Sequence, residues 1–167
     1  MKVKASGQGY IEHGNIKREF KNHFVSGGLQ LMATLFTFNT FGSPASHEYW
    51  FVSPAGVGTD TTTKTTFVMS TLVSPLSTLI NPSISYQHQT FNNSAALAQI
   101  TIAYPTSAFL SATIGEIGIN GVYTDSGYNI GYGLMSRAST ADGDFAAFAY
   151  NPANMLQITW NMIFSWV

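Results

Sequence analysis

Residues 155–167 read MLQITWNMIFSWV, and this stretch decides the fold. Large apolar side chains recur at every second position, and polar residues fill most of the positions between them. Successive side chains of a β-strand point to opposite faces of a sheet, so this alternation predicts a half-buried strand. Burial of six large side chains contributes on the order of 10–15 kcal/mol as an upper bound. The apolar set is Leu156, Ile158, Trp160, Met162, Phe164 and Trp166.

The rest of the chain is expected to supply the opposite face of a β-structure, in which Trp160 and Phe164 have structural roles. Shorter alternating stretches precede the C-terminal one, and they are separated by turn residues such as Asn92-Asn93-Ser94 and Asp142-Gly143-Asp144. About seven to nine strands with such turns between them predict a mainly β protein. The predicted fold is an antiparallel β-sandwich, jelly-roll-like in architecture.

One short helix is predicted near residues 27–38. Ser26 is a suitable N-cap, and Leu29, Met32, Ala33 and Phe36 recur at three- and four-residue spacing. The glycines of the N-terminal region interrupt any periodicity. The sequence therefore predicts an extended N-terminal arm at residues 1–14 and a single β-sandwich domain at residues 15–167.

The composition favours contact with other molecules. The chain has 167 residues and a formal net charge of -1, and charged residues make up only 9% of it, against roughly 25% in an average soluble protein. Low charge gives little protection against association, so much of the surface is expected to lie against neighbours. The alternative reading is a β-protein whose outward positions are filled by Thr and Ser. The absence of cysteine excludes disulfides and thiolate chemistry.

Most of the positive charge lies near the N-terminus. Of the seven basic residues, five lie within residues 1–21: Lys2, Lys4, Lys17, Arg18 and Lys21. These residues are expected to bind an acidic surface of a partner protein. Nucleic acid is not expected as a partner, because no aromatic residues are interleaved with the charges. No signal peptide and no apolar run long enough to span a bilayer are present, so synthesis in a cytosol and no membrane contact are expected.

The sequence offers little for catalysis or metal binding. The four histidines, at positions 13, 23, 47 and 88, are far apart and lack zinc-ligand spacing. Asp60, Asp142 and Asp144 lie in oxygen-rich turns, but the closing acidic residue of a calcium loop is missing. No nucleophile elbow and no phosphate-binding loop occur. We therefore expect no metal, no cofactor and no enzymatic activity.

Four stretches carry a resemblance to a known group of proteins. They are KNHFVSGGLQLMATL at 21–35, TLVSPL at 71–76, IGEIGIN at 114–120 with LMSRA at 134–138, and LQITWNMIF at 156–164. Together they resemble structural proteins of tailed bacteriophages, which occur as tail-fibre, tail-associated and capsid-surface components. In that group an E-I-G-L-F strand, an L-x-x-R-A strand and a closing I-T-W-x-I-x-F strand recur. This chain departs from the pattern at Ile119-Asn120, which replaces Leu-Phe, and in the glycine-rich stretch that follows.

Two charged residues within these motifs are predicted to be structural. Glu116 interrupts a strand that is otherwise apolar or glycine, and Arg137 lies on the strand expected to pair beside it. As neighbours they would form a cross-strand ion pair or bind backbone groups at the edge of the sandwich. A catalytic carboxylate would need a second carboxylate or a histidine within reach.

Two functional hypotheses follow. The first is a non-enzymatic virion protein, a capsid decoration or cement protein that binds the major capsid protein or other virion proteins. The N-terminal arm would lie across capsid subunits, open strand edges would add β-augmentation, and the protein would be a homo-oligomer. The alternative is a trimeric tail-fibre or tail-tip domain that binds host glycans through Tyr123, Tyr128 and Tyr132 in a glycine-rich segment. Both place the protein in the virion.

Overall fold

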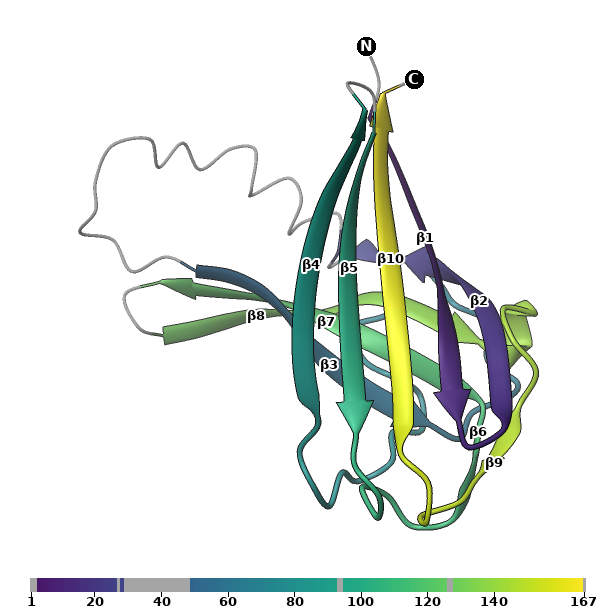
Figure 1. The fold of residues 1–167 in the computed structure, drawn as a ribbon. Coiled ribbons are helices and arrows are strands. Elements are labelled where there is room, and N and C mark those ends of the chain that lie inside the picture. Colours follow the sequence, from purple (N-terminus) through teal and green to yellow (C-terminus); the bar gives the residue numbers. More distant parts are fainter. Residues whose placement is uncertain (1–2, 27, 29–48, 93–94, 126–127, 167) are drawn as a thin grey trace.

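The computed structural model describes residues 3–26, 28, 49–92, 95–125 and 128–166, and the fold is mainly β and antiparallel, as predicted (Figure 1). One 3₁₀ turn, η1 (Thr140–Asp142), follows the eighth strand. The strands are β1 (Val3–His13), β2 (Ile16–Phe24), β3 (Tyr49–Gly58), β4 (Ser83–Asn92), β5 (Ala95–Tyr104), β6 (Ala112–Ile114), β7 (Glu116–Asp125), β8 (Tyr128–Ser139), β9 (Phe148–Tyr150) and β10 (Leu156–Trp166).

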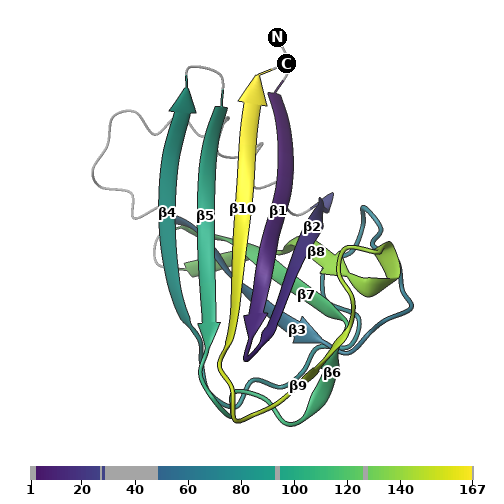
Figure 2. The ribbon, with the colours of Figure 1, turned by 45° about the vertical axis from the view of Figure 1, so that its right-hand side comes forward.

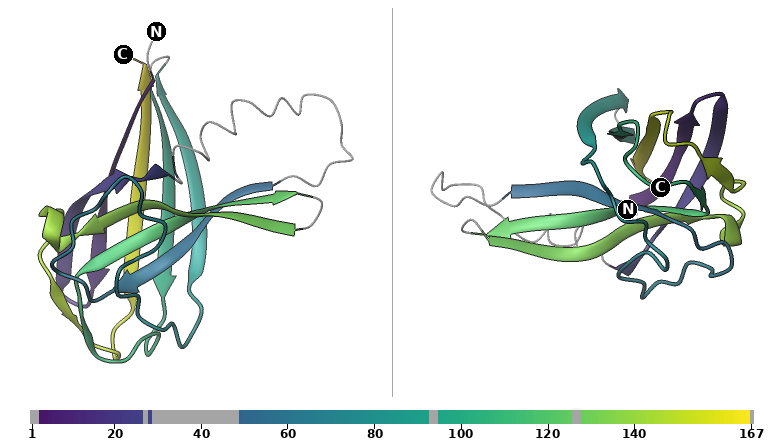
Figure 3. Two further views of the ribbon diagram at one scale, coloured as in Figure 1. Left: turned by 180° about the vertical axis from the view of Figure 1, so that it is seen from behind. Right: turned by 90° about the horizontal axis from the view of Figure 1, so that it is seen from below.

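Eight of these strands form one sheet that folds back on itself. Their order is β3-β7-β8-β2-β1-β10-β5-β4, and every neighbouring pair is antiparallel. Strand β2 joins the two layers, because its first seven residues pair with β1 and only His23 and Phe24 pair with β8. Strands β3, β7 and β8 therefore form a second layer that crosses the other five strands, behind them in Figure 2 and in front of them in the left view of Figure 3. The result is a nearly closed, barrel-like sheet, and β6 with β9 forms a separate small one.

The predicted C-terminal strand lies near the centre of the larger layer. Strand β10 pairs with β1 on one side and β5 on the other. Leu156, Ile158, Trp160 and Met162 are all at most 6% exposed. They pack in one core cluster with residues of the second layer such as Ile117 and Ile119. The alternation thus predicted the buried face correctly; the side chain of Phe164 lies outside the described residues.

The predicted N-terminal arm is wrong for residues 3–13. These residues form β1, an inner strand that pairs with β10 along its full length and with β2 from Gly7 onward. Gly9 explains why the sequence was misleading: it lies opposite both Phe20 and Trp160. Without a Cβ on Gly9, the two rings meet edge to face with their centroids 4.8 Å apart. The glycine belongs to the core packing rather than to a separate arm.

The helix predicted at residues 27–38 lies outside the described residues except for Gly28. Within the part of the chain that is described, no helix has the length and apolar character needed to cross a membrane.

Candidate functional site

The clearest cluster of functional groups is built on Glu116 and Arg137. Glu116 begins β7, and Arg137 lies on β8 opposite Gly118, one diagonal step away. Both side chains are fully buried. Arg137 donates from Nε to Glu116 Oε2 at 2.9 Å, and its Nη2 lies 2.8 Å from the same oxygen. The structure therefore brings together the two residues that the sequence predicted to be neighbours.

The remaining donors of Arg137 hold the long segment between β3 and β4. Nη1 donates to the carbonyl oxygen of Thr63 at 2.8 Å and to Thr65 Oγ1 at 3.0 Å. Nη2 donates to Asp60 Oδ2 at 3.1 Å. Each guanidinium nitrogen thus has an acceptor, which is what burial of a permanent charge requires.

Glu116 holds the same segment at a second point. Its carboxylate accepts hydrogen bonds from the backbone N–H groups of Val73 at 3.1 Å and Ser74 at 2.7 Å. Backbone donors and a guanidinium satisfy both oxygens of this buried carboxylate. The geometry suits a structural role, because the groups that would act in catalysis are occupied in fixing the chain.

Two further carboxylates lie beside this network, on and just after η1. Asp142 Oδ2 accepts from Thr65 Oγ1 at 2.6 Å and from Ser139 Oγ at 2.7 Å. Burial works to raise the pKa of Asp142, but these hydrogen bonds outweigh it and the net pKa is lowered. Asp144 accepts from the Ser139 N–H at 2.9 Å, and burial raises its pKa despite that bond.

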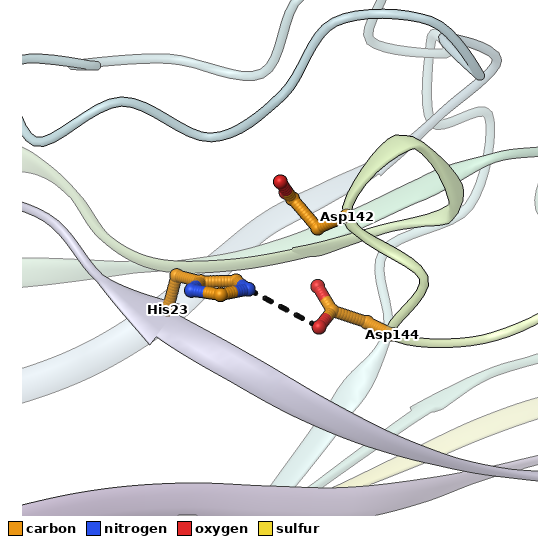
Figure 4. Close-up of side chains that lie close together, drawn as sticks. All are labelled: His23, Asp142 and Asp144. Carbon is orange, nitrogen blue, oxygen red and sulfur yellow. Dashed lines mark hydrogen bonds and ion pairs between the residues drawn. The ribbon is translucent and has the colours of Figure 1, made fainter.

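His23 completes a cluster with these two carboxylates (Figure 4). Its Nε2 lies 3.2 Å from Asp144 Oδ1, and one ligand atom from each of His23, Asp142 and Asp144 lies within 4.8 Å of the other two. A cation could approach these atoms, but both carboxylates already accept hydrogen bonds from Thr65 or Ser139. The arrangement accounts for an ion pair when His23 is protonated. The sequence alone could not predict this contact, since His23 and Asp144 are 121 positions apart.

A shallow hollow of about 360 Å³ lies on the outer face of the larger layer, beside this cluster. Strands β1, β2 and β10 form it, and Gly143 with Asp144 borders it. Tyr10 and Glu19 also line a neighbouring hollow of about 510 Å³. The polar side chains of the first hollow are those of Gln8, Tyr10, Glu19, Lys21, Asp144 and Asn161.

Most of the predicted basic residues belong to strands of the sheet. Lys17, Arg18 and Lys21 are exposed on β2. Lys17 Nζ lies 2.7 Å from Glu12 Oε1, so part of its charge is compensated. Lys4 lies in β1 with its side chain outside the described residues, and Lys2 is outside them altogether. The fold thus places four of these five residues on two adjacent strands.

The predicted tyrosines lie on the β7–β8 hairpin. Tyr123 pairs with Ile130 and Tyr128 with Asp125, while Tyr132 follows in β8. Their backbone is part of the sheet, and their side chains lie outside the described residues.

Exposed apolar side chains collect on three loops at the end of the sheet where β10 begins. Leu79 is 58% exposed, Ile80 46%, Leu110 73% and Met155 51%. The loops are joined by hydrogen bonds from Leu79 N to the Ala108 carbonyl oxygen at 2.8 Å and from Ser107 N to the Pro152 carbonyl oxygen at 2.7 Å. We call Leu79, Ile80, Leu110 and Met155 the apolar end.

Buried His13 ties the third loop to the sheet. Its Nε2 accepts from the Asn151 N–H at 2.8 Å, so Nδ1 carries the proton and donates to the Met155 carbonyl oxygen at 3.1 Å. The apolar end is therefore held by defined contacts. No protein family model, no curated protein and no solved structure matches this chain.

Proposed function

We propose that this protein is a non-enzymatic structural component of a tailed-bacteriophage virion, a decoration or cement protein on the outer surface of the capsid. The protein acts by occupying a surface, and its partners are the major capsid protein or other virion proteins.

One observation carries this proposal: segments that resemble the phage group meet in a single buried network. Glu116 of IGEIGIN binds Arg137 of LMSRA and the backbone of Val73 and Ser74 in TLVSPL. The 21–35 stretch lies beside this network, because His23 of β2 pairs with Arg137 of β8 in the sheet. Three of the resembling segments therefore contribute groups to this one network. This arrangement is consistent with the stretches belonging to one structural unit, as the resemblance implies.

The apolar end is the surface that best suits attachment to a capsid. Exposed apolar side chains on loops that are fixed to one another lose little conformational freedom on binding. Exposed large apolar side chains gathered on neighbouring loops are typical of interaction sites. The N-terminal arm is not the proposed contact, because residues 3–13 already pair with β10 and residues 7–13 also pair with β2.

Binding to particles tests the proposal directly. Particles of the phage whose genome encodes this chain would be prepared without it, and the purified protein would be added and cosedimented. We expect saturable binding at symmetric positions on the capsid. Failure of the protein to appear in wild-type particles, or its presence on the tail alone, would refute the capsid role.

Matched variants test the surface. Leu110→Asn removes an apolar contact at the apolar end, and Val68→Asn changes an equally exposed residue, 78% accessible, outside it. We expect at least about a tenfold loss of capsid affinity for the first, which corresponds to about 1.4 kcal/mol, and little change for the second. Equal effects would show that the apolar end is not the contact.

A second candidate function, glycan binding by a tail component, is supported by the hollow around Tyr10. Tyr10 is 38% exposed there and stands beside the amides of Gln8 and Asn161, a combination suited to a sugar ring and its hydroxyls. A glycan array of bacterial surface oligosaccharides tests it. A specific signal lost in Tyr10→Ala and kept in Gln87→Ala would favour this function, and an absence of signal would exclude it.

A further inference from the structure

The cluster of His23, Asp142 and Asp144 brings together three side chains that can bind a metal ion (Figure 4). His23 lies near the end of β2, whereas the two aspartates lie at the end of η1 and just beyond it. One ligand atom of each residue lies within 4.8 Å of the other two. Zinc binds imidazole nitrogen and carboxylate oxygen at about 2.0–2.2 Å. Small side-chain movements would therefore bring all three groups onto a single ion.

The turn at η1 fixes the backbone of the two aspartates. Gly143 between them has a φ of 77°, and its N–H donates to the Thr140 carbonyl oxygen at 3.1 Å. Asp144 N donates to the Ser139 carbonyl oxygen at 3.1 Å, and Asp142 N donates to Ser139 Oγ at 3.2 Å. Both carboxylates are thus positioned by the fold before an ion binds, which lowers the cost of binding.

The hydrogen bonds to these carboxylates leave oxygen lone pairs for an ion. The Ser139 N–H donates to Asp144 Oδ2 at 2.9 Å, while Oδ1 of the same carboxylate lies 3.2 Å from His23 Nε2. On Asp142, the hydroxyls of Ser139 and Thr65 both donate to Oδ2. The described donor to Asp142 Oδ1 is the Thr65 N–H, which is shared with Oδ2. Outer hydrogen bonds of this kind orient the carboxylate ligands of metal ions.

The buried charges around η1 are unbalanced, which is a separate reason to expect a cation. Four carboxylate side chains here are at most 10% exposed, those of Asp60, Glu116, Asp142 and Asp144. Arg137 is the only buried lysine or arginine among the described side chains. Four negative charges thus share one permanent positive charge. Burial of carboxylates without matching positive charge is costly, so this part of the fold favours a further cation.

The cluster can be reached from solvent. The side chain of His23 is 49% exposed. Gly143 and Asp144 border the hollow of about 360 Å³ that β1, β2 and β10 form. An ion could therefore enter without opening the turn, and a water molecule could fill the coordination position that the protein leaves free.

We propose that His23, Asp142 and Asp144 bind a Zn²⁺ ion, His23 through Nε2 and each aspartate through one carboxylate oxygen. His23 would then keep its ring proton on Nδ1. The imidazole ligand favours zinc over calcium and magnesium, which prefer oxygen ligands. The ion would join the end of β2 to the loop that follows β8. The proposal departs from the sequence-based expectation of no metal, which rested on spacing along the chain, and it does not depend on the virion role.

Calorimetric titration of the full chain with zinc chloride, after treatment with a chelator and its removal, tests the site. We expect one zinc ion per chain, with a dissociation constant that rises at least about tenfold in His23→Ala and in Asp144→Asn. Two matched controls should leave it unchanged. His88→Ala removes a histidine on β4, and Glu19→Gln removes an exposed carboxylate that borders the same hollow. Circular dichroism would show that each variant is folded.

Thermal denaturation gives an independent readout. Zinc should raise the melting temperature of the unaltered chain and of His88→Ala, because an ion that binds only the folded state stabilises it. It should not raise the melting temperature of His23→Ala. The exposure of His23 makes this variant decisive, since its loss should not unfold the protein. A chain that binds no zinc would overturn the proposal, and so would binding that His23→Ala leaves unchanged, which would show an adventitious ion only.

Discussion

At the scale of single residues, Arg137 is the side chain whose removal should have the largest effect. Its guanidinium is fully buried and binds Glu116, Asp60 and the Thr63 carbonyl oxygen. Removing one partner of a buried ion pair leaves the other charge uncompensated, which typically costs about 3–5 kcal/mol. We expect Arg137→Met to lower the free energy of unfolding by about this amount, as measured by urea denaturation.

The exposed pair of Lys17 and Glu12 is the control for that experiment. Lys17 is 79% exposed, and solvent screens such surface ion pairs, so this pair should contribute little to stability. Lys17→Met should therefore leave the unfolding midpoint almost unchanged. If the two substitutions had similar effects, the Arg137 network would not stabilise the fold as its contacts indicate.

The carboxylates around Arg137 predict a dependence of stability on pH. Burial works to raise the pKa of Asp60, but hydrogen bonds from Thr63 and Thr62 lower it on balance, and the pKa of Asp142 is lowered as well. A pKa that is lower in the folded state adds stability above the ordinary aspartate value of about 3.9, and that stability is lost as pH falls through the folded value. Urea midpoints should therefore fall steeply in acid, and Asp60→Asn should flatten this decline.

The contribution of Asp144 to stability should change with pH in the opposite direction to those of Asp60 and Asp142. Burial raises its pKa in the folded protein, so its contribution is present at low pH and is lost as pH rises through the folded value. Asp144→Asn should consequently destabilise the protein less at neutral pH than Asp142→Asn does. A larger loss for Asp144→Asn would mean that its bonds to Ser139 and His23 outweigh the cost of burying its charge.

At the scale of strands, Gly9 determines how β1 packs against its neighbours. A Cβ at this position would overlap the Thr159 carbonyl oxygen and the ring of Phe20. Overpacking of this kind typically costs about 1–3 kcal/mol. We expect Gly9→Ala to lower the melting temperature clearly, while Gln8→Ala at the adjacent exposed position changes it little.

The strands also show what the sequence could and could not predict. Strand β10 could be predicted from its alternation, because every inward position has a large apolar side chain. Strand β1 could not be predicted from its pattern, because Gly7 and Gly9 stand at positions where an apolar side chain would be expected. Side chains of neighbouring strands occupy the space beside these glycines. In a sequence such a glycine suggests the end of a strand. In the sheet Gly9 makes room for an aromatic side chain of the neighbouring strand.

The candidate site was predictable to a similar extent. Glu116 and Arg137 stood out as charges within apolar strands, which is a local signal. Their partners Asp60, Thr63 and Thr65 lie in a polar segment that reads as an ordinary surface loop. The contact between His23 and Asp144 depends on the bend at β2, which no local pattern specifies.

At the scale of the whole molecule, the sheet depends on pairing the two ends of the chain. Strand β10 lies between β1 and β5, so its loss would expose two new edges and the main core. We expect a chain that ends at residue 155 to remain unfolded, as judged by near-ultraviolet circular dichroism and limited proteolysis. Because the β1–β10 contact spans nearly the full sequence, folding of the intact chain should take milliseconds to seconds.

The antiparallel pairing of β1 with β10 also makes the two ends of the sheet different. Val3 lies opposite Trp166 at one pole, and His13 lies opposite Leu156 at the other, next to the apolar end. A peptide or fluorescent domain fused before Val3 or after Trp166 would leave from the pole remote from Leu110 and Met155. If the apolar end rests on a shell of subunits, such a cargo would project outward from it, and the chain could serve as a scaffold for displaying antigens on particles.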